Sequence, residues 1–172
     1  MLVAGVTGSG KSTLAGLLAE RLDLPYVEID SLYHGPGWVP RDQFEAEVDA
    51  FTRGDRWVIE WQYRTVRALL GDRADTLVWL DHPLSVSLFR VLRRTVRRSR
   101  NRTVLWNGNV EPPLRSVFTS SESILRWAWK TRHSYREAVP LMAESHPHLQ
   151  IVRLRGQRQV DDWLAGLAPA SS

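Results

Sequence analysis

The chain contains no cysteine, which excludes disulfide scaffolds, cysteine-ligated zinc sites and thiol catalysis. No stretch approaches the ~18 consecutive apolar residues that a membrane-spanning helix needs, so we do not expect a transmembrane protein. The opening residues 1–6 lack the basic region of a secretory leader and are too short to form one. These absences predict a cytoplasmic protein without a membrane partner.

Lysine is scarce, and one long stretch has no acidic residue. Only Lys11 and Lys130 are lysines among the 23 basic residues of the chain. Between His82 and Val110 there is no acid but there are seven arginines: Arg90, Arg93, Arg94, Arg97, Arg98, Arg100 and Arg102. They account for the formal net charge of +4, because the remainder of the chain is net negative. The planar guanidinium suits phosphate recognition, although a solvated helix face would have the same composition.

The length and the hydrophobic pattern predict one α/β domain. At about 150 residues per domain, 172 residues make a single unit, 1–172, and a hydrophobic share of 43% is enough for a sizeable core. Strands are expected at 2–6, 26–29, 57–60, 76–80 and 149–154. Helices are expected at 11–22, 41–51, 63–70, from Pro83 to about 99, 120–138 and 160–167. Alternating strands and helices imply a parallel sheet covered on both faces, with an irregular excursion near 100–116.

The most specific signal is a phosphate-binding loop at 5–12, Gly-Val-Thr-Gly-Ser-Gly-Lys-Ser. Glycines at three of its positions let the backbone curl until its N–H groups point at phosphate oxygens. Lys11 brings a positive charge to the β- and γ-phosphates of a bound nucleotide, and the Ser12 hydroxyl can ligate Mg²⁺. The motif lies between an expected strand and an expected helix, which argues against an accidental match. The expected ATP-binding residues of this loop are Gly5, Thr7, Gly8, Ser9, Gly10, Lys11, Ser12 and Thr13.

Beyond this loop the chain resembles the adenylate-kinase-like P-loop kinases, which include nucleotide, shikimate and gluconate kinases. The resemblance is strongest to small bacterial adenylate-kinase-related proteins often labelled DNA topology modulation proteins, and it rests on the segments 29–34, 57–59, 73–81, 105–109 and 124–130. It implies a three-layer P-loop NTPase fold with a five-stranded parallel sheet of order 2-3-1-4-5. It also implies ATP·Mg²⁺ as phosphoryl donor and a lid of about residues 98–118.

Three acids lie at the carboxyl ends of expected strands and are candidates for the reaction centre. Asp30 could accept a proton from an acceptor hydroxyl, order the water shell of Mg²⁺, or simply cap the turn that follows. By the resemblance, Glu60 stands for an acid of the Mg²⁺ shell. Asp81 ends an apolar strand, so it could hold Mg²⁺ through water or serve a structural strand-to-helix turn. The sequence does not rank the three acids.

The acceptor side departs from the nucleotide-kinase pattern. By the resemblance, Arg64 stands for the arginine that clamps an acceptor phosphate, although a solvated arginine is an equal alternative. Trp61 and Tyr63 replace the glycine and proline of that pattern, so the acceptor cannot be carried over. Of the arginine-rich stretch, we expect one or two of Arg94, Arg98 and Arg102 to contact phosphate.

Several further residues lie close to these candidates in the sequence. By the resemblance, the loop at Arg155 and Gly156 lies against the adenine ring of ATP. The rings of Trp106, Trp127 and Trp129 could stack a base, although Trp127 and Trp129 could equally belong to the core. The turn of Asn107, Gly108 and Asn109 could be a lid hinge or contact the acceptor. The five histidines show no metal-binding spacing.

Together these features predict an ATP-dependent phosphotransferase acting on a small molecule, with a nucleoside or nucleotide as one class of acceptor. A nucleic-acid-associated ATP-binding protein, either a 5′-hydroxyl polynucleotide kinase or a DNA topology modulator, is the alternative that the arginines support. A GTPase-like switch is disfavoured, because the chain has no Asn-Lys-x-Asp guanine-reading segment.

Overall fold

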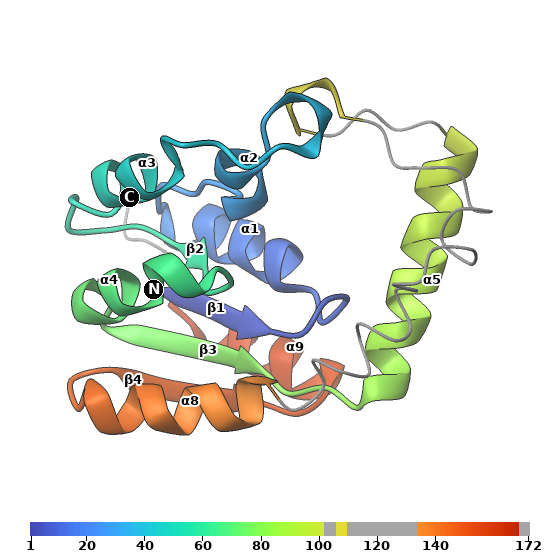
Figure 1. Cartoon of the computed structure of the whole chain (residues 1–172). Helices are drawn as coiled ribbons and strands as arrows, with labels where there is room; N and C mark the ends of the chain where they lie inside the picture. The colour runs from blue at the N-terminus through green and yellow to red at the C-terminus, as the bar shows by residue number, and fades with distance from the viewer. Residues whose placement is uncertain (102–105, 110–133, 169–172) are drawn as a thin grey trace.

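The computed structural model describes residues 1–101, 106–109 and 134–168, with the side chains of 98–101 left out. Its centre is a parallel sheet of four strands in the order β2-β1-β3-β4 (Figure 1). The strands are β1 (Leu2–Gly5), β2 (Ile59–Glu60), β3 (Thr76–Leu80) and β4 (Gln150–Leu154). Because all four strands run parallel, their carboxyl ends meet at one edge of the sheet, where ligands bind in open α/β folds.

The expected five-stranded sheet of order 2-3-1-4-5 is wrong, because the segment 26–29 does not form a strand. It contributes only an isolated parallel bridge between Tyr26 and Val58. Ile29 already belongs to a helix, α2 (Ile29–Tyr33), and its backbone N–H donates to Glu60 Oε2 at 2.9 Å. A hydrogen bond to a distant side chain therefore takes the donor that a further strand would have needed.

Helices cover both faces of the sheet. One apolar cluster joins Leu2, Ala4 and Leu77 to α2 and to three other helices, α3 (Phe44–Phe51), α4 (Arg67–Arg73) and α8 (Ser134–Ser145). The opposite cluster joins Val3, Val78 and Leu80 to α1 (Lys11–Leu22) and α9 (Gln157–Gly166). The alternation of Leu2, Val3 and Ala4 between the clusters follows from the two-residue period of a strand. The result is the expected three-layer α/β arrangement.

Other elements lie outside these layers. Helix α5 (Leu84–Asn101) runs away from the carboxyl edge of the sheet (Figure 1). Three 3₁₀ turns complete the described structure: η1 (Pro36–Trp38), η2 (Arg64–Val66) and η3 (Trp106–Gly108). Among the described residues, no helix is long and apolar enough to cross a membrane.

The helix predictions hold best where the signal is local. The 11–22 helix is confirmed at both ends. The α8 helix continues through Pro140 to Ser145, beyond the expected end at 138, while the first part of the expected 120–138 helix falls outside the described residues. The expected 41–51 helix begins at Phe44, and the final helix begins three residues early, at Gln157.

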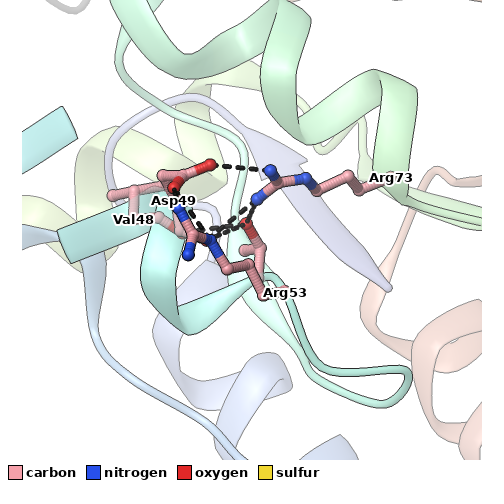
Figure 2. Close-up of polar contacts among 5 residues, drawn as sticks. Val48, Asp49, Arg53 and Arg73 are labelled. Carbon is pink, nitrogen blue, oxygen red and sulfur yellow. Dashed lines mark hydrogen bonds and ion pairs between the residues drawn. The ribbon is translucent and has the colours of Figure 1, made fainter. Parts of the chain in front are cut away.

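A cluster of charged groups fastens α3 to α4 on the side of the molecule away from the phosphate loop. Figure 2 shows Asp49 between two guanidinium groups, with Arg73 Nη2 and Arg53 Nη2 each 2.6 Å from a carboxylate oxygen. Arg73 also donates to the Asp49 carbonyl at 2.9 Å and to Thr52 Oγ1 at 2.8 Å. Hydrogen bonds from Arg73 and Arg53 hold the pKa of Asp49 below its usual range.

Replacing Asp49 by asparagine is expected to lower the melting temperature by a few degrees at neutral pH. The carboxylate is bound more tightly as an anion in the folded state, so its contribution is present above the unfolded-state pKa of about 3.9. The contribution is lost as the pH falls through the lower folded-state pKa, and the two proteins should then converge. Thermal denaturation from pH 7 to pH 3 measures this difference, and a gap that persists unchanged at pH 3 would contradict the assignment.

Candidate active site

The loop between β1 and α1 has the backbone of an anion cradle. Gly5, Gly8 and Gly10 have φ values of +154°, +79° and +98°, which side chains other than glycine rarely adopt. Gly10 is the N-cap of α1 and has no side chain to satisfy the free N–H groups of the first turn. These amides, with the positive end of the helix dipole behind them, remain available for a phosphate.

Helix α5 supports this loop from behind. The side-chain position of Gly8 faces α5 so closely that a Cβ there would overlap the Ser87 carbonyl oxygen and lie 2.5 Å from Val91 Cγ2. Arg90 Nη1 donates to the Ser9 carbonyl at 3.0 Å, and its Nη2 donates to Gln157 Oε1 at 2.7 Å. The arginine-rich helix thus holds the phosphate loop in place by contacts to the backbone of the loop at Gly8 and Ser9.

Two cavities lie on either side of the loop. The larger, about 570 Å³, is lined by the first residues of the loop and Lys11, by 62–64 and Arg67, and by the start of α8. The smaller, about 210 Å³, is lined by Ser9, Gly10 and Thr13 and by groups of α5 and α9. The loop therefore separates two spaces that open from the same edge of the sheet.

Lys11 is buried at the wall of the larger cavity. Its Nζ donates to the Val6 carbonyl at 3.3 Å. Burial lowers the pKa of Lys11 to about 8, against the opposing charges of Asp30 and Glu60, and Arg94 lowers it further. The structure thus brings four of the residues selected from the sequence within electrostatic reach of one another: Lys11, Asp30, Glu60 and Arg94.

Asp30 is held by two side chains of the segment after β2. Gln62 Nε2 and the Tyr63 hydroxyl both donate to Asp30 Oδ1 at 2.7 Å. Burial and the neighbouring carboxylate raise the pKa of Tyr63, so its hydroxyl stays protonated and acts as a donor. Oδ2 has no hydrogen bond to a described residue and remains able to accept one. Asp30 lies in the first turn of α2, which corrects its expected place at the end of a strand.

Glu60 has both carboxylate oxygens occupied. The Tyr26 hydroxyl donates to Oε1 and the Ile29 N–H donates to Oε2, both at 2.9 Å. The side chain is 2% exposed, and burial raises the pKa of Glu60 although these donors oppose the shift. The Ser12 hydroxyl lies close enough to lower the same pKa. Glu60 therefore fixes the start of α2 beside the phosphate loop.

Asp81 serves a different set of contacts. Arg153 Nε donates to Oδ2 at 3.0 Å and Arg136 Nε donates to Oδ1 at 3.2 Å. Burial alone would raise the pKa of Asp81, but the two arginines outweigh it and the net shift is downward. Arg153 also lies over the Trp79 ring, 4.3 Å from its centroid. The carboxylate ties the end of β3 to β4 and α8. These contacts do not test its expected roles at Mg²⁺ or in a strand-to-helix turn.

The remaining candidates are distributed around the two cavities. Arg64 is exposed in η2 and lines the larger cavity. Arg155 and Gly156 directly precede α9, which lines the smaller cavity through Gln157 and Val160. The side chain of Arg98, all of Arg102 and the rings of Trp127 and Trp129 fall outside the described residues, as does most of the expected lid.

The η3 turn is fastened to the segment around α2 and η1. Trp106 Nε1 donates to Glu28 Oε2 at 2.7 Å, and Asn107 Nδ2 donates to the His34 carbonyl at 2.5 Å. Asn109 is buried, where its Oδ1 accepts from the Trp38 N–H and its Nδ2 donates to the Gly35 carbonyl. These contacts show how the turn is anchored and do not test its expected role as hinge or acceptor contact.

Sequence reasoning did not identify Gln62 or Tyr63 as partners of Asp30, nor Arg67 as a cavity residue. Arg67 opens α4, and its guanidinium lies 4.6 Å from the Trp61 ring centroid and 5.3 Å from that of Tyr135. The only signal in the sequence was that Trp61 and Tyr63 depart from the nucleotide-kinase pattern. Both residues make these contacts: Tyr63 donates to Asp30, and the Trp61 ring packs against the Arg67 guanidinium.

Comparison with known proteins gives structural matches only. No protein-family model matches the chain, and no curated protein matches its sequence. It is similar to a gluconokinase from Sinorhizobium meliloti, with 22% identity, a TM-score of 0.52, and coverage of 97% of this chain and 91% of that one. A shikimate kinase from Acinetobacter baumannii in complex with shikimate has 18% identity and a TM-score of 0.55, and the match covers 95% of this chain and 87% of that one. A putative kinase from Chloroflexus aurantiacus has 17% identity and a TM-score of 0.50, with coverage of 95% of this chain and 94% of that one.

At these identities the likeness establishes the fold. The α/β fold with a parallel sheet matches that of the gluconokinase and the shikimate kinase. None of these three structures links the chain to DNA topology modulation.

Proposed function

We propose that the protein is an ATP-dependent phosphotransferase that acts on a small molecule. The observation that carries this proposal is the position of the phosphate loop between two separate cavities. A phosphoryl transfer needs a donor and an acceptor that approach the same phosphate from opposite sides. The kinase fold supports the same reading.

The smaller cavity fits the nucleoside end of ATP. It is lined by Leu14, Leu17 and Val160 together with the polar groups of His82, Arg90 and Gln157, a combination suited to a flat heterocycle with polar edges. Arg155 and Gly156 directly precede Gln157, which lines this cavity, and would contact the ring. The phosphates would then follow the loop amides of residues 5–13 to Lys11.

Mg²⁺ would be held by the hydroxyl of Ser12, an exposed residue at the start of α1. Among the described residues no three carboxylates or histidines form a metal cluster, which agrees with a cation held mainly by phosphate oxygens and water. ATP·Mg²⁺ would supply the phosphoryl group and part of its charge neutralisation. Asp81 is left out of this site because two arginines occupy its oxygens.

Asp30, which is hydrogen-bonded to two residues that line the larger cavity, would accept the proton of the acceptor hydroxyl. Gln62 and Tyr63 fix its orientation through Oδ1, and Oδ2 is left for a ligand. Glu60, with both oxygens occupied, would act as a positioning residue for α2 and Ser12. Lys11 and Arg94, with Arg98 and Arg102, would stabilise the charge that develops on the transferred group, and Arg64 would lie at the mouth of the acceptor cavity.

The test is acceptor-dependent consumption of ATP with Asp30→Asn as the diagnostic variant. With Mg²⁺ and a panel of sugars, hydroxy acids, nucleosides and nucleotides, at least one compound should be phosphorylated. Asparagine cannot accept the proton, so kcat should fall about 10²- to 10³-fold. Asp55→Asn, which alters an exposed loop carboxylate, is the matched control and should retain full activity. ATP hydrolysis that no acceptor stimulates, or a fully active Asp30→Asn protein, would refute the proposal.

A nucleic-acid-associated role remains the second candidate, because Arg93 and Arg97 are exposed on α5 in a stretch without acids. Counterion release makes phosphate-backbone binding fall steeply with salt. An electrophoretic mobility-shift assay with DNA at two ionic strengths separates the two candidate functions. Salt-sensitive binding favours the nucleic-acid role. Absence of binding at low salt means that the arginines serve to bind ATP or its acceptor.

A further inference from the structure

The Tyr63 hydroxyl lies between the Asp30 carboxylate and the His34 ring. Its oxygen is 2.7 Å from Asp30 Oδ1 and 3.3 Å from His34 Nε2. A hydroxyl has one hydrogen to donate, and a carboxylate has none of its own, so the short contact requires that Tyr63 donates to Asp30. Tyr63 then has no hydrogen left for His34. The contact between Nε2 and the hydroxyl oxygen is therefore attractive only if Nε2 carries a hydrogen and donates it.

The other nitrogen of the His34 ring agrees with this assignment. A neutral histidine ring carries one hydrogen, on either Nδ1 or Nε2. His34 Nδ1 is buried and has no hydrogen-bond partner in the part of the chain that the structure describes. A buried N–H without an acceptor is rarer and less favourable than a buried acceptor without a donor. Both nitrogens thus place the hydrogen on Nε2, and the result is a chain in which His34 donates to Tyr63 and Tyr63 donates to Asp30.

Aromatic side chains hold the His34 ring in this position. Tyr33 and Trp38 contact it edge-to-face, with ring centroids 5.0 Å and 5.2 Å from its own. Trp106 of η3 lies nearly parallel to it at 6.3 Å. Trp38 has a φ of +63°, which is unusual for a bulky residue, and its N–H donates to the buried Asn109 side chain at 3.1 Å. The η1 and η3 turns therefore keep the ring in place beside Tyr63.

We infer that His34 is a positioning residue for the phosphoryl transfer, because it orients the Tyr63 hydroxyl and through it the Asp30 carboxylate. The inference rests on the proposed function and adds a residue to the same site. A hydroxyl that both accepts and donates has one preferred direction, and each hydrogen bond of such a chain strengthens the next. Asp30 is then held in one orientation before the acceptor binds, which a proton transfer in the transition state requires.

The chain itself is unchanged by the reaction. The acceptor hydroxyl loses its proton to Asp30 Oδ2 as its oxygen forms a bond to the γ-phosphorus. The bond from that phosphorus to the leaving ADP oxygen breaks. His34 and Tyr63 keep their hydrogens, so neither is a catalytic residue.

Nitrogen-15 NMR of the protein labelled in its histidines tests the direction of the chain without any acceptor. In a neutral ring the chemical shifts of the two nitrogens identify the one that carries the hydrogen. The His34 resonances are assigned by their absence from the spectrum of His34→Gln. We expect the hydrogen on Nε2, recorded where the ring is neutral. A hydrogen on Nδ1 would overturn the inference.

Steady-state kinetics of two His34 variants tests the consequence for turnover. His34→Phe keeps an aromatic ring without the donor, so kcat should fall about 5- to 10-fold while KM for ATP stays unchanged. His34→Gln keeps an N–H group near the position of Nε2 and should recover most of the loss. His148→Phe, at an exposed histidine before β4, is the matched control and should have the wild-type kcat. If His34→Phe does not fold, the NMR assignment still decides.

Combining His34→Phe with Tyr63→Phe distinguishes positioning from support of the fold. If His34 acts through the Tyr63 hydroxyl, the double variant should have the same kcat as Tyr63→Phe alone. Losses that multiply would show that His34 acts independently of Tyr63, and would refute the inference.

The outcomes also separate this inference from the proposed function. If turnover depends on Asp30 but His34→Phe keeps the wild-type kcat, the role of His34 is wrong while the kinase proposal stands. If no acceptor stimulates ATP consumption, or if Asp30→Asn is fully active, the proposed function fails whichever nitrogen of His34 carries the hydrogen.

Discussion

Replacing Lys11 by alanine is expected to reduce acceptor-dependent ATP turnover at least ~10²-fold while leaving the fold intact. The ammonium group is buried at the wall of the larger cavity, within electrostatic reach of Asp30 and Glu60. In so dry a position its charge acts on the transferred phosphoryl group with little screening. Burial of that charge is also unfavourable for the free protein, so the melting temperature of the variant should not fall.

Steady-state kinetics with an acceptor that the wild-type protein phosphorylates measures the loss of turnover. Thermal denaturation of the same variant measures its stability. Lys11→Met is the matched variant, because it keeps most of the side-chain volume and should be equally inactive. Full turnover in either variant would show that the Lys11 ammonium group is not needed for catalysis, and would contradict the proposed mechanism. A melting temperature far below wild type would show that the lysine is chiefly structural.

The lowered pKa of Lys11 gives the same prediction a pH dependence. In the free protein the pKa lies at about 8, so the ammonium is charged below that pH and neutral above it. Phosphate favours the charged form, so binding should take up a proton near pH 8 and the affinity for ATP should weaken as the pH rises further. Calorimetry in buffers of different ionisation enthalpy detects this uptake, which should be absent in Lys11→Met.

The phosphate loop was predictable because its determinants are local. A short apolar strand, three glycines and the start of a helix are consecutive in the chain, and β1 and α1 form where the sequence places them. Backbone conformation, N–H direction and helix dipole all follow from that one segment. No distant contact is needed to recognise it.

The three acids could not be ranked because their partners are distant in the sequence. Asp30 is oriented by Gln62 and Tyr63, more than 30 residues away, while Asp81 is bound by Arg136 and Arg153 more than 50 residues away. A strand ending in an acid predicts the edge of the sheet at which the side chain lies. It does not predict which neighbouring side chains occupy its oxygens, and those neighbours decide its chemistry.

The absent fifth strand has the same explanation. Residues 26–29 have the composition of a strand, yet the Ile29 N–H is bound by the Glu60 carboxylate and the chain turns into α2. The propensity of four residues is worth little against one buried, charge-assisted hydrogen bond. The same hydrogen bond places Asp30 in the first turn of a helix, so the error in the sheet and the error in the site have a single cause.

Replacing Gly8 by alanine is expected to weaken ATP binding more than ~10²-fold. At φ +79° an L side chain is strained by roughly 1–2 kcal/mol, and the new Cβ would overlap the Ser87 carbonyl oxygen of α5. Either the loop or α5 must then shift, and both the inward N–H groups and the Arg90 contact to Ser9 depend on their present spacing. Calorimetric titration with ATP·Mg²⁺ measures the loss.

Gly16→Ala is the matched control, because Gly16 lies within α1 and a Cβ there would meet nothing within 4 Å. Alanine favours a helix over glycine by about 0.5–1 kcal/mol, so this variant should bind ATP normally and melt higher. Adding Val91→Ala to Gly8→Ala removes the side-chain overlap but leaves the Ser87 backbone in place. The double variant should therefore still bind ATP poorly, whereas recovery of binding would mean that Val91, rather than the backbone of α5, sets the position of the loop.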